Sequence, residues 1–205
     1  MSVRLCTGSD LAGALRQVGT AGGASLWMIP NDTLTLLQRV VHTCSYTEQP
    51  TQVGAYGVFQ NLASCNRFDE HSPFHELRRA FEEYLNATVA GLPDGERPFP
   101  PTVGFTEMVL QKYPCGLVGI TPHRDGTPYT DLIAVFTLCG TARVGICADR
   151  AGNGETVLNS QPGTVILLKA PGFAGATTDH RPFHFVSDIT EERISLALRQ
   201  KRATP

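Results

Sequence analysis

The pattern of hydrophobic and polar residues changes near residue 100 of the 205-residue chain. Before that point, apolar residues recur every three or four positions in three segments, which is typical of amphipathic helices. The apolar stripe of the third segment is typical of packing surface. We predict helices over Asp10–Val18 (capped by Ser9 and ended at Gly19), directly after Pro30-Asn31-Asp32, and directly after Ser72-Pro73.

After Pro98-Phe99-Pro100-Pro101 the apolar runs become short and are separated by Gly, Pro and Asp. Many short strands at such spacing indicate an antiparallel β-sandwich or barrel. We predict eight strands, over Phe105–Tyr113, Gly119–His123, Leu132–Leu138, Ala142–Cys147, Glu155–Leu158, Thr164–Lys169, Phe183–Val186 and Arg193–Arg199.

The last of these strands has one polar and one apolar face, because successive side chains of a strand point to opposite sides. The apolar face carries Ile194, Leu196 and Leu198, and the polar face begins with Arg193 and Ser195. We expect the polar face to line a ligand cavity and the helices to cover the apolar face. The fold class is therefore α+β, mainly β, with Trp27 and Met28 also expected in the core.

A helical half of about 100 residues would not fold well apart from the sheet, so we expect one domain over residues 1–205. Within it, residues 1–100 form a helical, substrate-side portion and residues 101–205 form the β core.

Composition and charge favour a soluble protein that acts on small molecules. The formal net charge of −2 gives no polybasic footprint, which disfavours nucleic acid and anionic membranes as partners. The chain shows no apolar leader and no apolar run long enough to cross a membrane, so we expect a cytoplasmic location. Six cysteines without a CxxC pair are expected to be reduced thiols.

Two histidines and one aspartate predict a metal site. His123 and Asp125 are two positions apart at the end of a predicted strand, where both can project the same way. His184, inside a later strand, can supply a third ligand. Two imidazoles and a carboxylate suit non-haem Fe(II), which keeps coordination positions open for a co-substrate and O2. His180 is the main alternative to His184, but its neighbours indicate a loop.

A cation follows the second histidine at a useful distance. Arg193 opens the last strand, and arginine binds a carboxylate through two parallel hydrogen bonds. Ser195 faces the same way and can donate a further hydrogen bond. The paired histidines His71 and His75 lack the glutamate of a zinc-protease motif and are interpreted as surface or capping residues.

From about residue 105 to 199, the HxD…H order and the following arginine resemble the Fe(II)- and 2-oxoglutarate-dependent dioxygenases. This resemblance implies a double-stranded β-helix, or jelly roll, with the N-terminal helices packed on one sheet. It also implies that iron is held by the three residues above, with no catalytic residue beyond the metal centre. For 2-oxoglutarate it implies contacts from Arg193 first, and then from Tyr113, Ser195, Arg199 and Gln111.

The resemblance implies oxidation of a C–H bond, with release of succinate and CO2. We expect hydroxylation of a small molecule. A first alternative is an AlkB-like demethylase of nucleic acid or protein, because Arg193 and Arg199 match two arginines of that branch, although Ser195 and Ala197 do not match its other residues. A second is a cupin-like ligand-binding protein without oxygenase activity. No motif indicates the substrate, which the first hundred residues and the loops at 126–131 and 148–163 would select.

Overall fold

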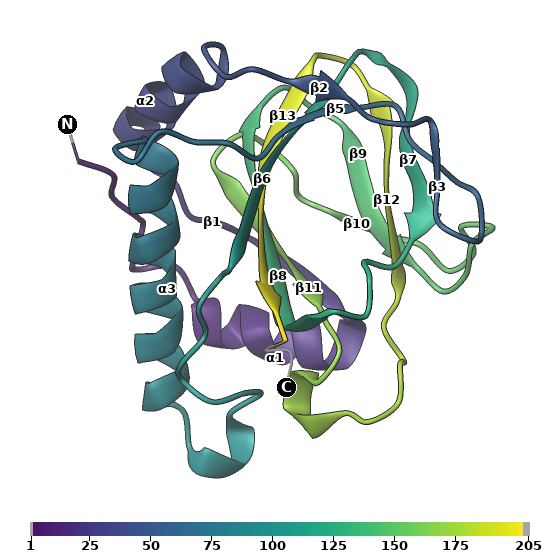
Figure 1. Cartoon of the computed structure of the whole chain (residues 1–205). Coiled ribbons are helices and arrows are strands. Elements are labelled where there is room, and N and C mark those ends of the chain that lie inside the picture. The colour runs from purple at the N-terminus through teal and green to yellow at the C-terminus, as the bar shows by residue number, and fades with distance from the viewer. Residues whose placement is uncertain (1, 203–205) are drawn as a thin grey trace.

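Two main β-sheets, a separate two-stranded hairpin and three helices make up the computed structural model of the chain, which describes residues 2–202 (Figure 1). The helices are α1 (Leu11–Ala21), α2 (Asn31–Val41) and α3 (Pro73–Gly91), with short 3₁₀ turns η1 (Asp94–Glu96) and η2 (Phe173–Gly175). No helix in this part of the chain has the length and apolar composition needed to cross a membrane.

The strands of the first half are short. They are β1 (Gly23–Trp27), β2 (Thr47–Glu48), β3 (Gln52–Val53), β4 (Val58–Phe59) and β5 (Ala63–Cys65). The second half holds the longer strands β6 (Glu107–Tyr113), β7 (Gly116–His123), β8 (Tyr129–Cys139), β9 (Arg143–Cys147), β10 (Thr156–Leu158), β11 (Thr164–Lys169), β12 (Phe183–Ile189) and β13 (Arg193–Lys201). All eight strands predicted after residue 100 are present, with ends shifted by up to three residues.

The larger sheet has the strand order β1-β11-β8-β13-β6-β5-β2, and the smaller has β10-β9-β12-β7. Side chains from both sheets form one apolar cluster between them, including Ile133 and Ile166 from the larger sheet and Ile146 and Val186 from the smaller. All the pairings within these two sheets are antiparallel. The expected α+β sandwich is confirmed.

The helices cover the outer face of the larger sheet, as Figure 1 shows for α3. Ile194, Leu196 and Leu198 of β13 are fully buried in one cluster with side chains of all three helices, including Phe81 of α3. The phenylalanine ring meets the ring of Phe136 on β8 edge-on, with 5.1 Å between centroids. The predicted division of β13 into an apolar helix-facing side and a polar inner side is therefore confirmed.

The first helix begins and ends later than predicted. The side chain of Asp10, and not that of Ser9, accepts the hydrogen bond of a first-turn amide, that of Gly13. Ser9 instead donates to the carbonyl of Trp27. The helix continues through Gly19 and ends at Gly22, whose left-handed conformation (φ 86°) a residue without Cβ adopts most easily.

The first hundred residues are less purely helical than predicted. β1 pairs with β11 and β5 pairs with β6, so that both extend the larger sheet. Trp27 lies at the end of β1 with 43% of its surface exposed, and its ring covers Gly163. The prediction of a core position was wrong for Trp27 and right for the fully buried Met28.

Candidate metal centre

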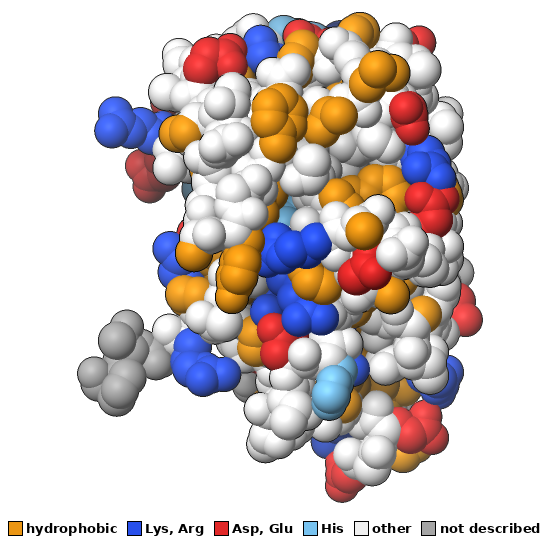
Figure 2. Space-filling view, turned by 90° about the vertical axis from the view of Figure 1, so that its right-hand side faces the viewer, with side chains coloured by type: hydrophobic (Ala, Val, Ile, Leu, Met, Phe, Trp, Pro, Cys, Tyr) orange, Lys and Arg blue, Asp and Glu red, His pale blue; other side chains and the backbone are white. Residues whose placement is uncertain are grey.

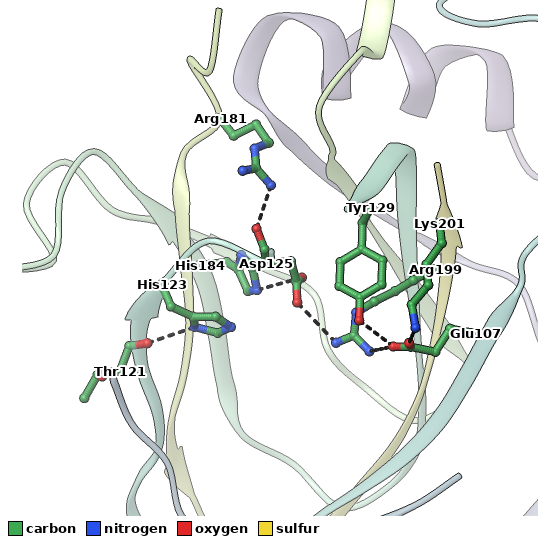
Figure 3. Close-up of polar contacts among 9 residues, drawn as sticks. All are labelled: Glu107, Thr121, His123, Asp125, Tyr129, Arg181, His184, Arg199 and Lys201. Carbon is green, nitrogen blue, oxygen red and sulfur yellow. Dashed lines mark hydrogen bonds and ion pairs between the residues drawn. The ribbon is translucent and has the colours of Figure 1, made fainter. Parts of the chain in front are cut away.

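Three predicted metal ligands meet at one end of the smaller sheet (Figure 3). His123 is the last residue of β7, Asp125 follows two residues later, and His184 lies opposite His123 on the neighbouring strand β12. The two imidazole centroids are 4.1 Å apart, and Nε2 of His184 is 3.5 Å from an oxygen of Asp125. Each residue offers a donor atom within 4.8 Å of the others.

The positions of His184 and His180 distinguish the two candidates for the third metal ligand. His184 is mostly buried beside Asp125, whereas His180 is exposed in the preceding loop and lies outside the cluster. The reason is the strand pairing, since β12 lies between β7 and β9 and its first residues are held in register with His123.

Neighbouring polar groups orient the cluster. Nδ1 of His123 lies 3.0 Å from the carbonyl oxygen of Thr121, so this nitrogen carries the hydrogen and donates it. Nε2 of the same ring is then a free electron-pair donor, as in many metal-binding histidines. The buried Arg181 donates to the carbonyl of Asp125 at 3.0 Å and thereby fixes the loop after β7.

The charge states of the cluster suit metal binding. Burial raises the pKa of Asp125. The charges of Arg199 and of the two histidines lower this pKa by more than burial raises it, so that it falls to about 2. Burial, followed by the charge of His123, lowers the pKa of His184 to about 3. Burial also lowers the pKa of His123. At neutral pH the site therefore presents one carboxylate and two neutral imidazoles.

Arg193 lies in the same cavity as the three ligands and is fully buried. Its guanidinium donates to the hydroxyls of Ser195 (2.9 Å) and Thr137 (3.2 Å), and its Nε has no partner among the described residues. The ring of Tyr113 lies 5.6 Å away. Among residues 2–202, no salt bridge or hydrogen bond pairs the guanidinium of Arg193 with a carboxylate. The positive charge of Arg193 is therefore not balanced.

Arg199 lies differently from Arg193. Figure 3 shows its guanidinium between two carboxylates, with Asp125 at 3.3 Å and Glu107 at 3.4 Å. Glu107 also accepts from the hydroxyl of Tyr129 at 2.7 Å and from Lys201 at 2.8 Å. Arg199 therefore has its charge balanced and holds Asp125 against β13.

The predicted co-substrate residues surround the cavity. Gln111, Tyr113, Arg193 and Arg199 line it, together with apolar residues of both sheets such as Ile166. Ser195 bonds the guanidinium of Arg193, with which it is buried. All eight site residues predicted from the sequence therefore lie in or beside this one cavity.

Three further residues of the site were not predicted. Thr137 on β8 holds Arg193, Glu107 holds Arg199, and Arg181 holds the backbone of Asp125. Arg181 stands in Asp179-His-Arg-Pro182, where a buried arginine next to an aspartate could have indicated an internal ion pair. The contacts of Thr137 and Glu107 come from strand pairing, which no local motif encodes.

No protein-family model and no curated protein matches the sequence. Solved structures do match. A prolyl-4-hydroxylase from Pseudomonas putida has a TM-score of 0.64 at 16% identity, over 94% of this chain and 99% of that one. An oxidoreductase of the 2OG-Fe(II) oxygenase family from Burkholderia pseudomallei has a TM-score of 0.63 at 12% identity, over 94% and 91%. OsALKBH1 has a TM-score of 0.61 at 14% identity, over 87% and 98%.

The chain has the fold of the 2OG-Fe(II) oxygenases. The match spans nearly the whole chain, so the N-terminal hundred residues belong to this fold together with the jelly-roll core. The HxD…H triad, His123, Asp125 and His184, is present within it.

Proposed function

We propose that the protein is an Fe(II)- and 2-oxoglutarate-dependent oxygenase that oxidises a C–H bond of a small molecule. One observation carries this proposal. The three-residue donor cluster and the unbalanced, buried Arg193 share a single cavity between the two sheets. One group suits a divalent metal ion and the other suits a carboxylate, and 2-oxoglutarate has both a chelating end and a distal carboxylate.

The donor set fits Fe(II). Two imidazole nitrogens and one carboxylate oxygen form the ligand set of non-haem iron oxygenases, in which the remaining positions stay open. Two of the three residues are held before any ion binds, because Thr121 orients His123 and both Arg181 and Arg199 hold Asp125. Such supporting contacts raise metal affinity by fixing ligand orientation.

Arg193 fits the distal carboxylate of 2-oxoglutarate. A buried charge without a counter-charge costs several kcal/mol, and a bound anion would remove that cost. The free Nε of the guanidinium offers a hydrogen bond that no described residue accepts. Tyr113 and Gln111 line the space beside it and are proposed to contact the same molecule, with Ser195 holding the guanidinium.

When bound, Fe(II) and 2-oxoglutarate supply the oxidising chemistry, in which O2 oxidises a substrate C–H bond while 2-oxoglutarate becomes succinate and CO2. The chain supplies binding and position. Arg193 fixes the co-substrate, and the apolar walls formed by residues such as Ile166, Leu168 and Val135 exclude water from the reacting groups.

An AlkB-like demethylase is the second candidate function. It is supported by the two arginines of β13, one free and one paired with Asp125, and by the fold shared with OsALKBH1. Against it stand the formal net charge of −2 and the lack of matches to that branch at Ser195 and Ala197. Salt-dependent binding of single-stranded nucleic acid would favour this candidate, because phosphate contacts release counterions.

The test is consumption of 2-oxoglutarate by the purified protein with Fe(II) and O2. We expect succinate to form slowly even without substrate, and to require both the metal ion and Arg193. The variant Asp125→Ala should form none, whereas His180→Ala should keep the wild-type rate. Binding of Fe(II) and 2-oxoglutarate without any succinate would instead support a cupin-like binding protein.

A further inference from the structure

We propose that Arg124 and Arg150 bind an anionic group of the substrate at the rim of the metal centre. The substrate is then a small molecule that bears a carboxylate or a phosphate. This inference rests on the proposed oxygenase function and names the chemistry that its substrate site recognises. The two arginines, with Phe183 and Tyr56, are called the rim cluster below.

The two guanidinium groups of the rim cluster share one aromatic ring. The central carbon of Arg124 lies 4.3 Å from the centroid of Phe183, and that of Arg150 lies 5.2 Å from the same centroid. The second group also lies over the ring of Tyr56, at 4.4 Å. The ring of Phe183 therefore has two like charges beside it, and the aromatic contacts limit the directions in which the N–H groups point.

The rim cluster adjoins the metal ligands along the chain. Arg124 stands between His123 and Asp125, and Phe183 directly precedes His184. Asp125 and His184 keep 12% and 17% of their side-chain surface exposed, so both ligands are within reach of solvent. A chain of contacts also links the cluster to the centre, because Asp179, which lies 4.0 Å from Arg124, pairs with Arg181, and Arg181 donates to the carbonyl of Asp125.

Positive charge exceeds negative charge at this rim. Asp179 accepts two hydrogen bonds from Arg181, both at 2.8 Å, and so is already paired. Its distance to Arg124 is 4.0 Å, which allows only a weak interaction. Arg124 and Arg181 therefore share the carboxylate of Asp179, and an anion would balance the remaining positive charge.

The hydrogen-bonding capacity of the cluster is also unused. Nε of Arg124 is buried and has no partner among the described residues. Arg150 has no ion pair or side-chain hydrogen bond with any of residues 2–202, although Asp149 directly precedes it. The oxygens of Asp149 accept instead from the side chain of Asn153 and from backbone amides of the same turn.

The surface around the cluster fits a small anion and not a polymer. Figure 2 shows Lys and Arg side chains gathered near the middle of the face on which β7 and β12 lie, between hydrophobic side chains. The next arginine along this face, Arg143, is paired with Glu155 and has its charge balanced. A nucleic acid strand needs a longer row of unpaired cations than the cluster provides.

Tyr56 adds an aromatic wall beside Arg150. It lies in the turn between β3 and β4, a two-stranded hairpin that is separate from both main sheets, and 77% of its surface is exposed. Two hydrogen bonds between Phe59 and Thr121 tie the base of this hairpin to β7. The tyrosine can therefore cover a ligand that lies on Arg150 without disturbing the sandwich.

Calorimetric titration with inorganic phosphate tests the proposal. The protein is loaded anaerobically with Mn(II) and saturated with 2-oxoglutarate, so that Arg193 is occupied, and a parallel titration uses acetate. We expect Arg150→Gln and Arg124→Gln each to weaken phosphate binding about tenfold or more, as for a lost charge-assisted hydrogen bond. The matched control Arg39→Gln, on the exposed face of α2, should leave it unchanged.

The relative strength of phosphate and acetate binding identifies which anion the rim prefers. Equal affinity in wild type and both rim variants would overturn the proposal, since phosphate would then bind elsewhere or directly to the metal. Tight binding of a single-stranded oligonucleotide that displaces phosphate would also overturn it.

A failure of the rim can be told apart from a failure of the oxygenase function. If Mn(II) and 2-oxoglutarate bind but phosphate binding ignores both rim arginines, only the rim proposal is wrong. If neither binds, the titration is repeated on the metal-free protein. In the metal-free protein, a loss of phosphate affinity in Arg150→Gln would support the anion site. The failure of Mn(II) and 2-oxoglutarate to bind would contradict the metal centre.

Discussion

At the scale of single residues, Arg193 makes the ligand-free protein less stable than its packing would allow. Its charge is fully buried, two hydroxyls are its only hydrogen-bond acceptors among residues 2–202, and burial lowers its pKa. Interiors usually exclude such a group unless it is paired. The 2-oxoglutarate proposed above would supply the missing negative charge.

Replacement of Arg193 by Met should therefore separate stability from function. Apolar groups of similar volume often stabilise a protein when they replace a buried charge, and we expect a gain of about 1–3 kcal/mol without ligand. With Mn(II) present throughout, added 2-oxoglutarate should stabilise the wild type by about 2.7 kcal/mol at a hundredfold excess over Kd, but not the variant. Urea unfolding with and without 2-oxoglutarate measures this effect. A less stable variant that 2-oxoglutarate still stabilises would contradict the assignment.

The metal assignment makes a second prediction at this scale. Asp125→Ala should reduce the affinity for Mn(II) by a factor of about 100 or more, because the only anionic ligand is lost and even supporting contacts are worth 10- to 100-fold. His180→Ala should change it by less than about threefold. Calorimetry on both variants checks this, with circular dichroism as a control for the fold. A weakened His180 variant with an intact Asp125 variant would reverse the choice of ligands.

The ion pair of Asp179 with Arg181 should make the stability of the protein depend on pH. Hydrogen bonds from Arg181 lower the pKa of Asp179 from 3.8 to about 2. A carboxyl group whose pKa is lower in the folded state stabilises the fold at any pH above its pKa in the unfolded chain. This stabilisation is lost as the pH falls through its pKa in the folded protein. The variant Asp179→Asn should thus be less stable than wild type at pH 5, and the difference should shrink between pH 3.8 and 2. Urea unfolding across this range measures it; a constant difference would contradict the pairing.

Residue patterns selected His123, Asp125, His184 and Arg193, which the structure places in one cavity, because their chemistry is rare enough in combination to stand out. They did not predict which partners hold them. Arg181 reaches the carbonyl of Asp125 across 56 positions of sequence, and Thr137 reaches Arg193 across the same separation. Such contacts depend on strand register, which a single sequence does not express.

At the scale of elements, β13 connects the site to the core. Its polar face holds Arg193 and Arg199, and its apolar face packs under the helices. Any helix that shifts on this face would move both arginines, since they share one strand with the buried leucines.

The variant Leu196→Ala should lower the free energy of unfolding by about 3–5 kcal/mol, as expected for a cavity in a closed core. Leu196 is fully buried, whereas Leu117 keeps 79% of its surface exposed on β7. The same change at Leu117 is the matched control and should cost less than about 0.5 kcal/mol. Urea denaturation compares the two, and similar losses would contradict the packing described.

Element prediction worked where a segment carries its own pattern. Thr164–Lys169 contains an unbroken apolar run at residues 165–168 and was predicted with its observed ends. Gly23–Trp27 was missed because two small residues begin it and its pairing partner lies more than 130 positions away. The wrong cap of α1 has a local cause, since Ser9 and Asp10 are both good capping residues and only the bond from Ser9 to Trp27 distinguishes them.

At the scale of the whole molecule, the two halves of the chain depend on each other. Strands from the first half extend the larger sheet at both ends, and the helices bury the apolar face of β13. We predict one cooperative unfolding transition, seen at the same urea concentration by circular dichroism and by the fluorescence of Trp27. A fragment of residues 101–205 should aggregate or stay unfolded. Two separate transitions, or a folded fragment, would contradict the prediction of a single domain.

The central claim is that one cavity holds a metal ion on the triad and 2-oxoglutarate on Arg193. Its most direct test is a crystal structure of the protein grown anaerobically with Mn(II) and 2-oxoglutarate. We predict one metal ion bound by His123, Asp125 and His184, with the distal carboxylate of 2-oxoglutarate on the guanidinium of Arg193. A metal ion elsewhere, or a cavity in which Arg193 binds no anion, would contradict the claim.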